Sequence, residues 1–126
     1  MAYRVSKSRF GELVEEALSQ LPQQFSQYLE EVPIEIRDRL TSTERQRLGL
    51  PGGGLLLGLY HGRPRTRRSV EESGRLPDVI YLFQDSIESV SRSEEELVEQ
   101  VRITLLHEIG HHFGLNEIDL DELGFG

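Results

Sequence analysis

The sequence predicts a single α+β domain, because helical and strand patterns occupy separate parts of a chain of ordinary domain length. Apolar residues recur at intervals of three and four over residues 10–21 and again over 97–113, which predicts one helix near each end. Three short segments between them have the composition of strands. A chain of 126 residues has room for one core, so we expect residues 1–126 to form one domain. In it a small mixed sheet of three or four strands packs against the N-terminal helix and the C-terminal helix.

The first predicted helix is amphipathic and begins near Ser8, whose hydroxyl can cap its free amides. Its apolar face consists of Phe10, Leu13, Val14, Ala17, Leu18 and Leu21. Pro22 ends or bends this helix, because proline has no N–H to donate. The helical spacing continues through Phe25, Tyr28 and Leu29, as though Pro22 stood in the first turn of a second short helix. We expect these apolar side chains to belong to the core.

Three segments in the middle of the chain predict strands. Apolar and polar side chains alternate over residues 32–36, as in a strand with one buried face, and Pro33 places that strand at an edge or at its own start. Residues 55–60 follow a Pro-Gly-Gly-Gly loop, and residues 79–83 follow a proline. The arginine-rich segment 62–77 between the last two strands is long for a hairpin loop.

The second main helix begins at a capping box, in which Ser93 and Glu96 can each satisfy a free amide at the helix start. Its apolar spacing runs through Leu97, Val98, Val101, Leu105, Leu106, Ile109 and Phe113. Gly114 is the expected C-terminal stop. A final short amphipathic turn, with Ile118, Leu120 and Leu123, can fold back on the domain.

Composition excludes several classes of function. The formal charge of −8 disfavours attraction to phosphate backbones, so we expect no nucleic-acid partner. The longest apolar run lies within residues 55–60, far below the about 20 residues that span a bilayer, and the N-terminus lacks the apolar core of a signal peptide. We therefore expect a cytoplasmic protein that binds no membrane. Because the chain has no cysteine, nitrogen or oxygen atoms must hold any metal.

The chemistry of the chain is concentrated at residues 107–111, which read His-Glu-Ile-Gly-His. On a helix, residues four apart project from the same face, so His107 and His111 can converge on one ion. Glu108 lies beside them on the helix edge, where its carboxylate can accept a proton from a metal-activated water. This pattern on an independently predicted helix indicates a zinc site with Glu108 as the catalytic carboxylate.

A third metal ligand is expected shortly after the helix. Gly114 can take the left-handed conformation that turns the chain sharply, and Glu117 can then approach the two histidines. Glu117 is therefore the favoured third ligand. Asp119, Asp121 and Glu122 are the alternatives.

Two further histidines have less specific surroundings. His112 is rotated by about 100° around the helix from His111, so we expect it to pack or hydrogen-bond rather than to bind metal. His61 precedes the arginine-rich segment and is interpreted as an exposed loop histidine, with a substrate or transition-state contact as the alternative. The arginines of that segment predict a solvated loop, with an anion site as the alternative.

Residues 107–117, with the pattern His-Glu-x-x-His-x-x-Gly-x-x-Glu, resemble the extended motif of metzincin-type zinc peptidases. The third ligand in that group is usually His or Asp, whereas here it is Glu. Through residues 55–60, 76–81 and 107–114, the chain also resembles a family of short bacterial zincin-like proteins that are taken to be metallopeptidases. The second resemblance covers most of the chain.

These resemblances imply a minimal zincin-like domain, with Zn²⁺ held by His107, His111 and Glu117 and with Glu108 as general acid/base. The methionine-containing turn of metzincins is absent, because Met1 is the only methionine. The implied function is a zinc metallopeptidase, a hydrolase acting on peptide or protein substrates.

We expect a peptide substrate to add to an exposed strand, either residues 79–83 or residues 55–60. The alternative function is a zinc-binding regulatory or peptide-binding module with little or no hydrolytic activity. The absence of a second large subdomain after the motif favours this alternative, whereas the carboxylate of Glu108 favours the enzyme.

Overall fold

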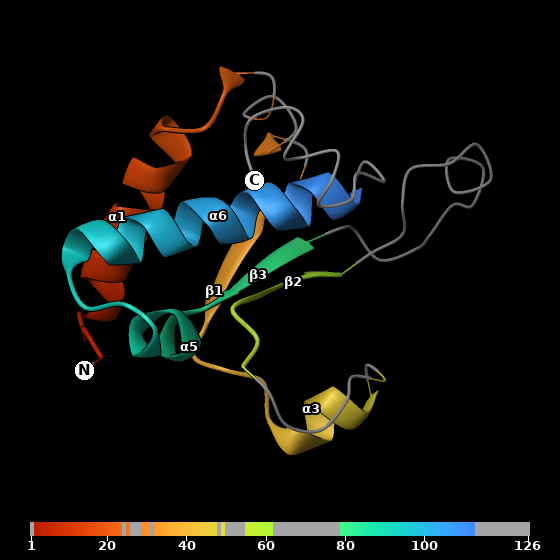
Figure 1. The fold of residues 1–126 in the computed structure, drawn as a ribbon. Helices are drawn as coiled ribbons and strands as arrows, with labels where there is room; N and C mark the ends of the chain where they lie inside the picture. Colours follow the sequence, from red (N-terminus) through yellow and green to blue (C-terminus); the bar gives the residue numbers. More distant parts are fainter. Residues whose placement is uncertain are drawn as a thin grey trace.

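Two layers, one of helices and one a small sheet, make up the domain in the computed structural model (Figure 1). The structure describes residues 2–23, 25, 29–30, 32–47, 49, 55–61 and 79–112, with the backbone alone at 61, 111 and 112. The elements follow one another as α1 (Lys7–Ser19), β1 (Ile34–Arg37), α3 (Ser42–Arg47), β2 (Gly58–His61), β3 (Val79–Phe83), α5 (Gln84–Ser89) and α6 (Glu94–His112). The α+β class predicted from the sequence is confirmed.

The sheet is mixed, with three strands in the order β1-β3-β2. β1 runs parallel to β3, with Ile34 opposite Ile80, and β2 runs antiparallel to β3, with Gly58 opposite Leu82. Ile80 and Leu82 of the central strand are 1% and 0% exposed, because they face the helices. The three predicted strand segments are confirmed, although β2 begins at Gly58 rather than at residue 55.

Pro33 immediately precedes β1, which is an edge strand. This is where proline is tolerated, because it has no N–H to contribute to a ladder. Its carbonyl still accepts a hydrogen bond from the Ile80 N–H at 3.0 Å. Both parts of the prediction for Pro33, an edge and a strand start, are therefore confirmed.

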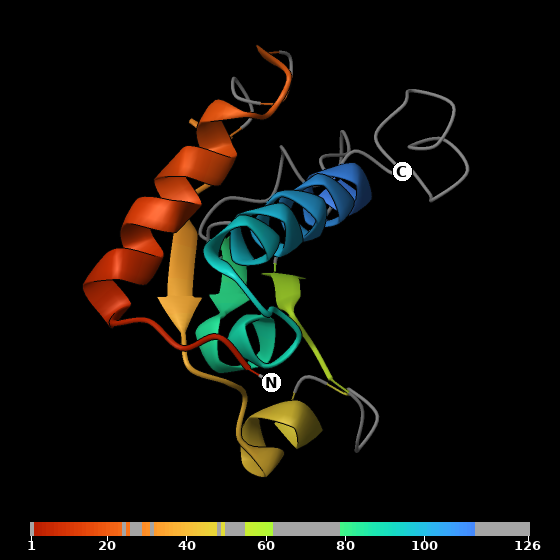
Figure 2. The same cartoon turned by 60° about the vertical axis from the view of Figure 1, so that its left-hand side comes forward.

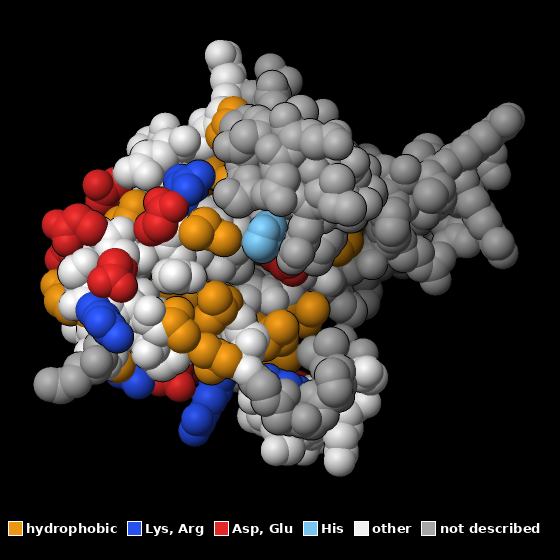
Figure 3. Space-filling view, viewed as in Figure 1, with side chains coloured by type: hydrophobic (Ala, Val, Ile, Leu, Met, Phe, Trp, Pro, Cys, Tyr) orange, Lys and Arg blue, Asp and Glu red, His pale blue; other side chains and the backbone are white. Residues whose placement is uncertain are grey.

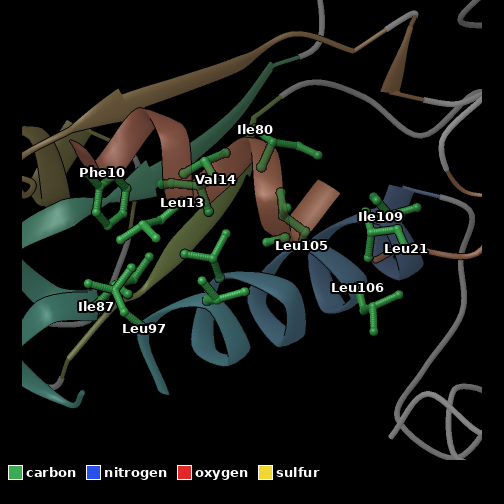
Figure 4. Packing of buried hydrophobic residues seen from close by; sticks show 14 of the residues in the cluster. Phe10, Leu13, Val14, Leu21, Ile80, Ile87, Leu97, Leu105, Leu106 and Ile109 are labelled. Atoms are coloured by element: carbon green, nitrogen blue, oxygen red, sulfur yellow. The ribbon is translucent and has the colours of Figure 1, made fainter. Parts of the chain in front are cut away.

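Helices α1 and α6 lie against each other on one face of the sheet (Figures 1 and 2). Their apolar faces meet β3 and α5 in one buried cluster, part of which is shown in Figure 4. Its fully buried members include Phe10, Leu13, Ile80, Leu82, Ile87, Leu97, Val101, Leu105, Leu106 and Ile109. Complete burial of one such side chain contributes about 1.5–3 kcal/mol, so this cluster is the main source of stability. In the described part of the chain, no helix combines the length and the apolar character needed to cross a membrane.

Side chains at the helix starts satisfy free amides. Ser93 Oγ accepts from the Glu96 N–H at 3.1 Å, as the predicted capping box requires. At α1 the cap is Ser6, whose Oγ accepts from the Arg9 N–H at 3.0 Å, so the prediction of Ser8 was wrong by two residues. Arg9 also donates to the Glu94 carboxylate at the start of α6, and this hydrogen bond lowers the pKa of Glu94. The beginnings of the two main helices are thereby joined.

Two short helices were not predicted. α3 begins with a reciprocal capping box, in which Thr41 Oγ1 accepts from the Glu44 N–H at 3.1 Å and Glu44 Oε1 accepts from the Thr41 N–H at 3.0 Å. α5 follows β3 without a loop, and the Asp85 N–H donates to the Asp38 carbonyl beyond β1 at 3.1 Å. Each has six residues, too few to show a helical period in the sequence.

The segment before α1 is held on α5 by a buried acid. Glu88 is 4% exposed, and its Oε2 accepts from the Val5 N–H at 2.9 Å. Arg4 donates to Glu88 Oε1 at 3.2 Å and to Asp85 Oδ1 at 2.7 Å. The Glu88 carboxylate is therefore paired and hydrogen-bonded, as a buried charge requires.

A pair of glycine substitutions tests the backbone conformations of this fold. A Cβ at Gly11, inside α1, or at Gly49 would meet no atom within 4 Å, but Gly49 alone has a positive φ, +69°. We expect Gly11→Ala to raise the free energy of unfolding by about 0.5–1 kcal/mol, since alanine is the better helix former. Gly49→Ala should lower it by about 1 kcal/mol, because a side chain disfavours the left-handed region. Urea denaturation measures both, and a Gly11→Ala protein less stable than Gly49→Ala would contradict the assigned conformations.

Candidate active site

Helix α6 carries the histidine and glutamate residues of the motif in its last two turns. It is continuous from Glu94 to His112, so His107 and His111 lie one turn apart on one side of the same helix. The His107 side chain is partly exposed. Figure 3 shows a histidine at the surface of the face that α6 crosses. The side chain of His111 lies outside the described residues, and the structure places its backbone alone.

Glu108 turns toward the sheet. The residue is 8% exposed, and its Oε1 accepts a hydrogen bond from the backbone N–H of Tyr60, in β2, at 3.0 Å. A hydrogen bond to an ionised carboxylate is roughly twice as strong as one between neutral groups. The carboxylate predicted to be catalytic is therefore held between α6 and β2, directly beside His107 in the chain.

The Tyr60 N–H lies on the outer edge of the sheet. The Phe83 N–H donates to the Leu57 carbonyl at 3.0 Å, and bonded and non-bonded pairs alternate along an antiparallel ladder. Gly58 and Tyr60 therefore direct their N–H and C=O groups away from β3. Among the described residues, no strand pairs with this edge of β2.

The same topology corrects one expectation about substrate binding. β3 has β1 on one side and β2 on the other, so its backbone groups are already paired. Residues 79–83 are thus excluded as a strand that an added peptide could extend. Of the two predicted strands, only the 55–60 segment, which becomes β2, has an edge that pairs with no other strand in the described structure.

Gly58 lies directly against two side chains of α6. A Cβ built on Gly58 would lie 2.5 Å from Thr104 Cγ2, 3.1 Å from the Tyr81 carbonyl oxygen and 3.6 Å from Glu108 Cγ. The first distance is far shorter than any normal contact, and the Thr104 side chain is itself buried, with its hydroxyl bonded to the Gln100 carbonyl at 2.7 Å. A larger residue at Gly58 would therefore push α6 away from the strand.

These contributions from β2 were not predicted from the sequence. The Tyr60 side chain packs against the core. The backbone amide of Tyr60 could not be recognised, because every residue except proline has one. Gly58 did leave a signal, since an isolated glycine in a strand pattern indicates a bulge or a close approach of another backbone.

Several predicted site residues lie outside the described residues. These are Glu117 and its alternatives Asp119, Asp121 and Glu122, the side chains of His61 and His112, and the arginines of residues 63–75. Within the described part, no group of three or more His, Asp or Glu side chains could hold a metal ion. Two of the three predicted ligand side chains, those of His111 and Glu117, are not in that part.

Comparison with known proteins identifies the family. No curated protein matches the chain. A conserved hypothetical protein from Thermus thermophilus has a similar structure, with a TM-score of 0.55 and 21% sequence identity, covering 94% of this chain and 97% of its own. That likeness shows a common fold. The model of a family described as zincin-like metallopeptidase matches residues 29–126, a span that includes all three strands and α6. The chain therefore belongs to the family of zincin-like metallopeptidases.

Proposed function

We propose that this protein is a zinc-dependent peptidase in which Glu108 is the general acid/base. The observation that carries the proposal is the placement of the Glu108 carboxylate, which is buried against the open edge of β2 by the helix that also carries His107 and His111. A site that only held a metal would have no need of a carboxylate at the edge to which a peptide can add. Membership of the zincin-like family supports the same reaction class.

The donor groups of the chain suit zinc. His107 and His111 offer two imidazoles from successive turns of one helix, and the chain has no cysteine that would favour a thiolate site. Glu117 is the proposed third ligand, by its position three residues after Gly114. When bound, zinc supplies a Lewis acid that polarises the peptide carbonyl and makes water acidic enough to provide hydroxide near neutral pH.

The proton transfers fall to Glu108. A carboxylate has about four lone-pair sites, so acceptance of the Tyr60 N–H leaves it able to take a proton from the attacking water. The same group then gives a proton to the departing amine, which is the usual exchange of roles between general base and general acid.

The substrate is proposed to be an extended peptide segment added to β2. Gly58 directs its backbone N–H and C=O outward along this edge, as strand addition requires, while the outward N–H of Tyr60 is held by Glu108. Apolar side chains gather below α6 on the same face (Figure 3), and Leu55, just before β2, is 56% exposed. Such a surface favours substrates with apolar side chains near the cleaved bond.

The first prediction concerns the histidines. We expect about one zinc per chain in the dialysed protein, and we expect His107→Ala and His111→Ala to abolish it because each removes a ligand. His112→Ala is the matched control, since this neighbour on α6 is rotated by about 100° from His111. Elemental analysis measures the content, and full zinc occupancy in the His107→Ala and His111→Ala proteins would refute the site.

The second prediction concerns the third ligand. Glu117→Ala should weaken zinc affinity by at least the 10–100-fold that loss of an outer-shell partner typically costs. Asp119→Ala, Asp121→Ala and Glu122→Ala serve as controls of similar charge in the same segment. Competition with a chromophoric chelator measures the affinities. A larger loss in any of the three controls would move the third ligand to that residue.

The third prediction separates the enzyme from a zinc-binding module. Glu108→Gln should bind zinc normally but cleave peptides about 10²–10⁴-fold more slowly, because the amide keeps the shape and accepts no proton. Cleavage of a mixed peptide library and zinc content are measured together for the parent and the variant. Undiminished cleavage by the variant would refute the role of Glu108, and a zinc-loaded parent that cleaves nothing would favour the module.

A further inference from the structure

We propose that the backbone N–H of Tyr60 positions the Glu108 carboxylate for catalysis, and that Gly58 is the residue that makes this contact possible. Both act through Glu108 and are positioning residues. The proposal rests on the proposed function, because orientation of this carboxylate affects the reaction only if Glu108 transfers the proton.

The contact is suited to fix a flexible side chain. A glutamate side chain has three rotatable bonds. A hydrogen bond that fixes the terminal carboxylate restricts rotation about all three. Here the donor is a backbone amide in a strand, which cannot rotate away, and the 3.0 Å bond lies in a site where Glu108 is 8% exposed. Burial strengthens the bond, because little water competes for the carboxylate.

Gly58 controls the distance between the two partners. Thr104 and Glu108 are four residues apart on α6, so both side chains lie on the face of the helix that meets β2. A Cβ on Gly58 would meet Thr104 Cγ2 at 2.5 Å and Glu108 Cγ at 3.6 Å. Any movement of α6 that relieves the contact at Thr104 therefore also carries Glu108 away from the Tyr60 N–H.

The proposed ligands occupy a different face of the same helix. His107 and His111 are also four residues apart, and around the helix they lie about 100° and about 60° from Glu108. A small displacement of α6 from β2 changes the position of the base without removing a ligand. Loss of positioning should thus lower kcat while zinc affinity stays within about twofold.

Amide hydrogen exchange tests the contact whether or not the protein cleaves peptides. In the full chain, the Tyr60 amide should exchange slowly, and Glu108→Ala should accelerate it by at least about tenfold, as expected for loss of a hydrogen bond to a charged group. Glu108→Gln keeps an acceptor oxygen and should preserve most of the protection. The Phe83 amide, which donates to Leu57 inside the sheet, is the internal control for folding. Equal Tyr60 exchange in the parent and in Glu108→Ala would overturn the proposal.

Compensating variants test the role of Gly58. Gly58→Ala should accelerate Tyr60 exchange and lower kcat by at least about tenfold, and the double variant Gly58→Ala/Thr104→Ser should recover much of both. Serine removes the clashing Cγ2 and keeps the hydroxyl that bonds to Gln100. Gly11→Ala is the matched control with open space around the new methyl group. Absence of any recovery in a double variant whose Phe83 amide stays protected would show that Gly58 acts in another way.

A comparison at Tyr60 isolates the donor itself. Tyr60→Pro and Tyr60→Ala both lose the phenol ring, but only proline removes the outward N–H, which takes no part in the ladder with β3. We expect the proline variant to have the lower kcat, by at least about tenfold, at equal zinc affinity. Equal kcat values would refute positioning by this amide. A parent protein that binds zinc and protects the Tyr60 amide through Glu108, but cleaves no peptide, would refute the proposed peptidase activity. It would leave the contact between Tyr60 and Glu108 established.

Discussion

The close packing of α6 on β2 is the constraint on which the rest of the structure depends. Among the described elements, α6 contributes the largest number of buried apolar side chains to the core, with Leu97, Val101 and Leu105 fully buried. The helix also contacts the strand at Gly58, where the side chains of Thr104 and Glu108 lie against the glycine backbone. The apolar cluster thus supplies the free energy that holds the helix in place, and the glycine sets how near its last turns lie to the sheet edge.

The main elements could be predicted because each buries one face in a regular pattern. The period of three to four in α1 and α6 and the short apolar run of β3 are direct results of that burial. The start of α1 could not be predicted in the same way. Ser6 and Ser8 can both cap a helix; in the structure the Val5 N–H is bonded to Glu88, and Ser6 after it has the extended backbone of an N-cap. α3 begins at a local capping box between Thr41 and Glu44, and at the start of α5 the Asp85 N–H donates to the Asp38 carbonyl; both helices are too short to show a helical period.

The candidate site, too, could be predicted only in part from the sequence. His107, Glu108 and His111 are recognisable because their chemistry is in their side chains and their spacing matches one helical turn. Tyr60 contributes a backbone amide, and only the register of β2 against β3 shows that this amide points outward. The approach of Glu108 to it is a tertiary contact over 48 positions of the chain, which no local pattern encodes.

An open strand edge is also a risk for the protein that has it. Unpaired N–H and C=O groups can accept the strand of another copy, and the chain can then associate edge to edge into aggregates. β2 limits this in two ways: it has only four residues, and the inward carboxylate of Glu108 already occupies the outward amide of Tyr60. Inward-pointing charges and short strands are common protections of natural edges. The carboxylate that we assign to proton transfer therefore also satisfies an edge amide of β2 to which a strand of another copy could otherwise bind.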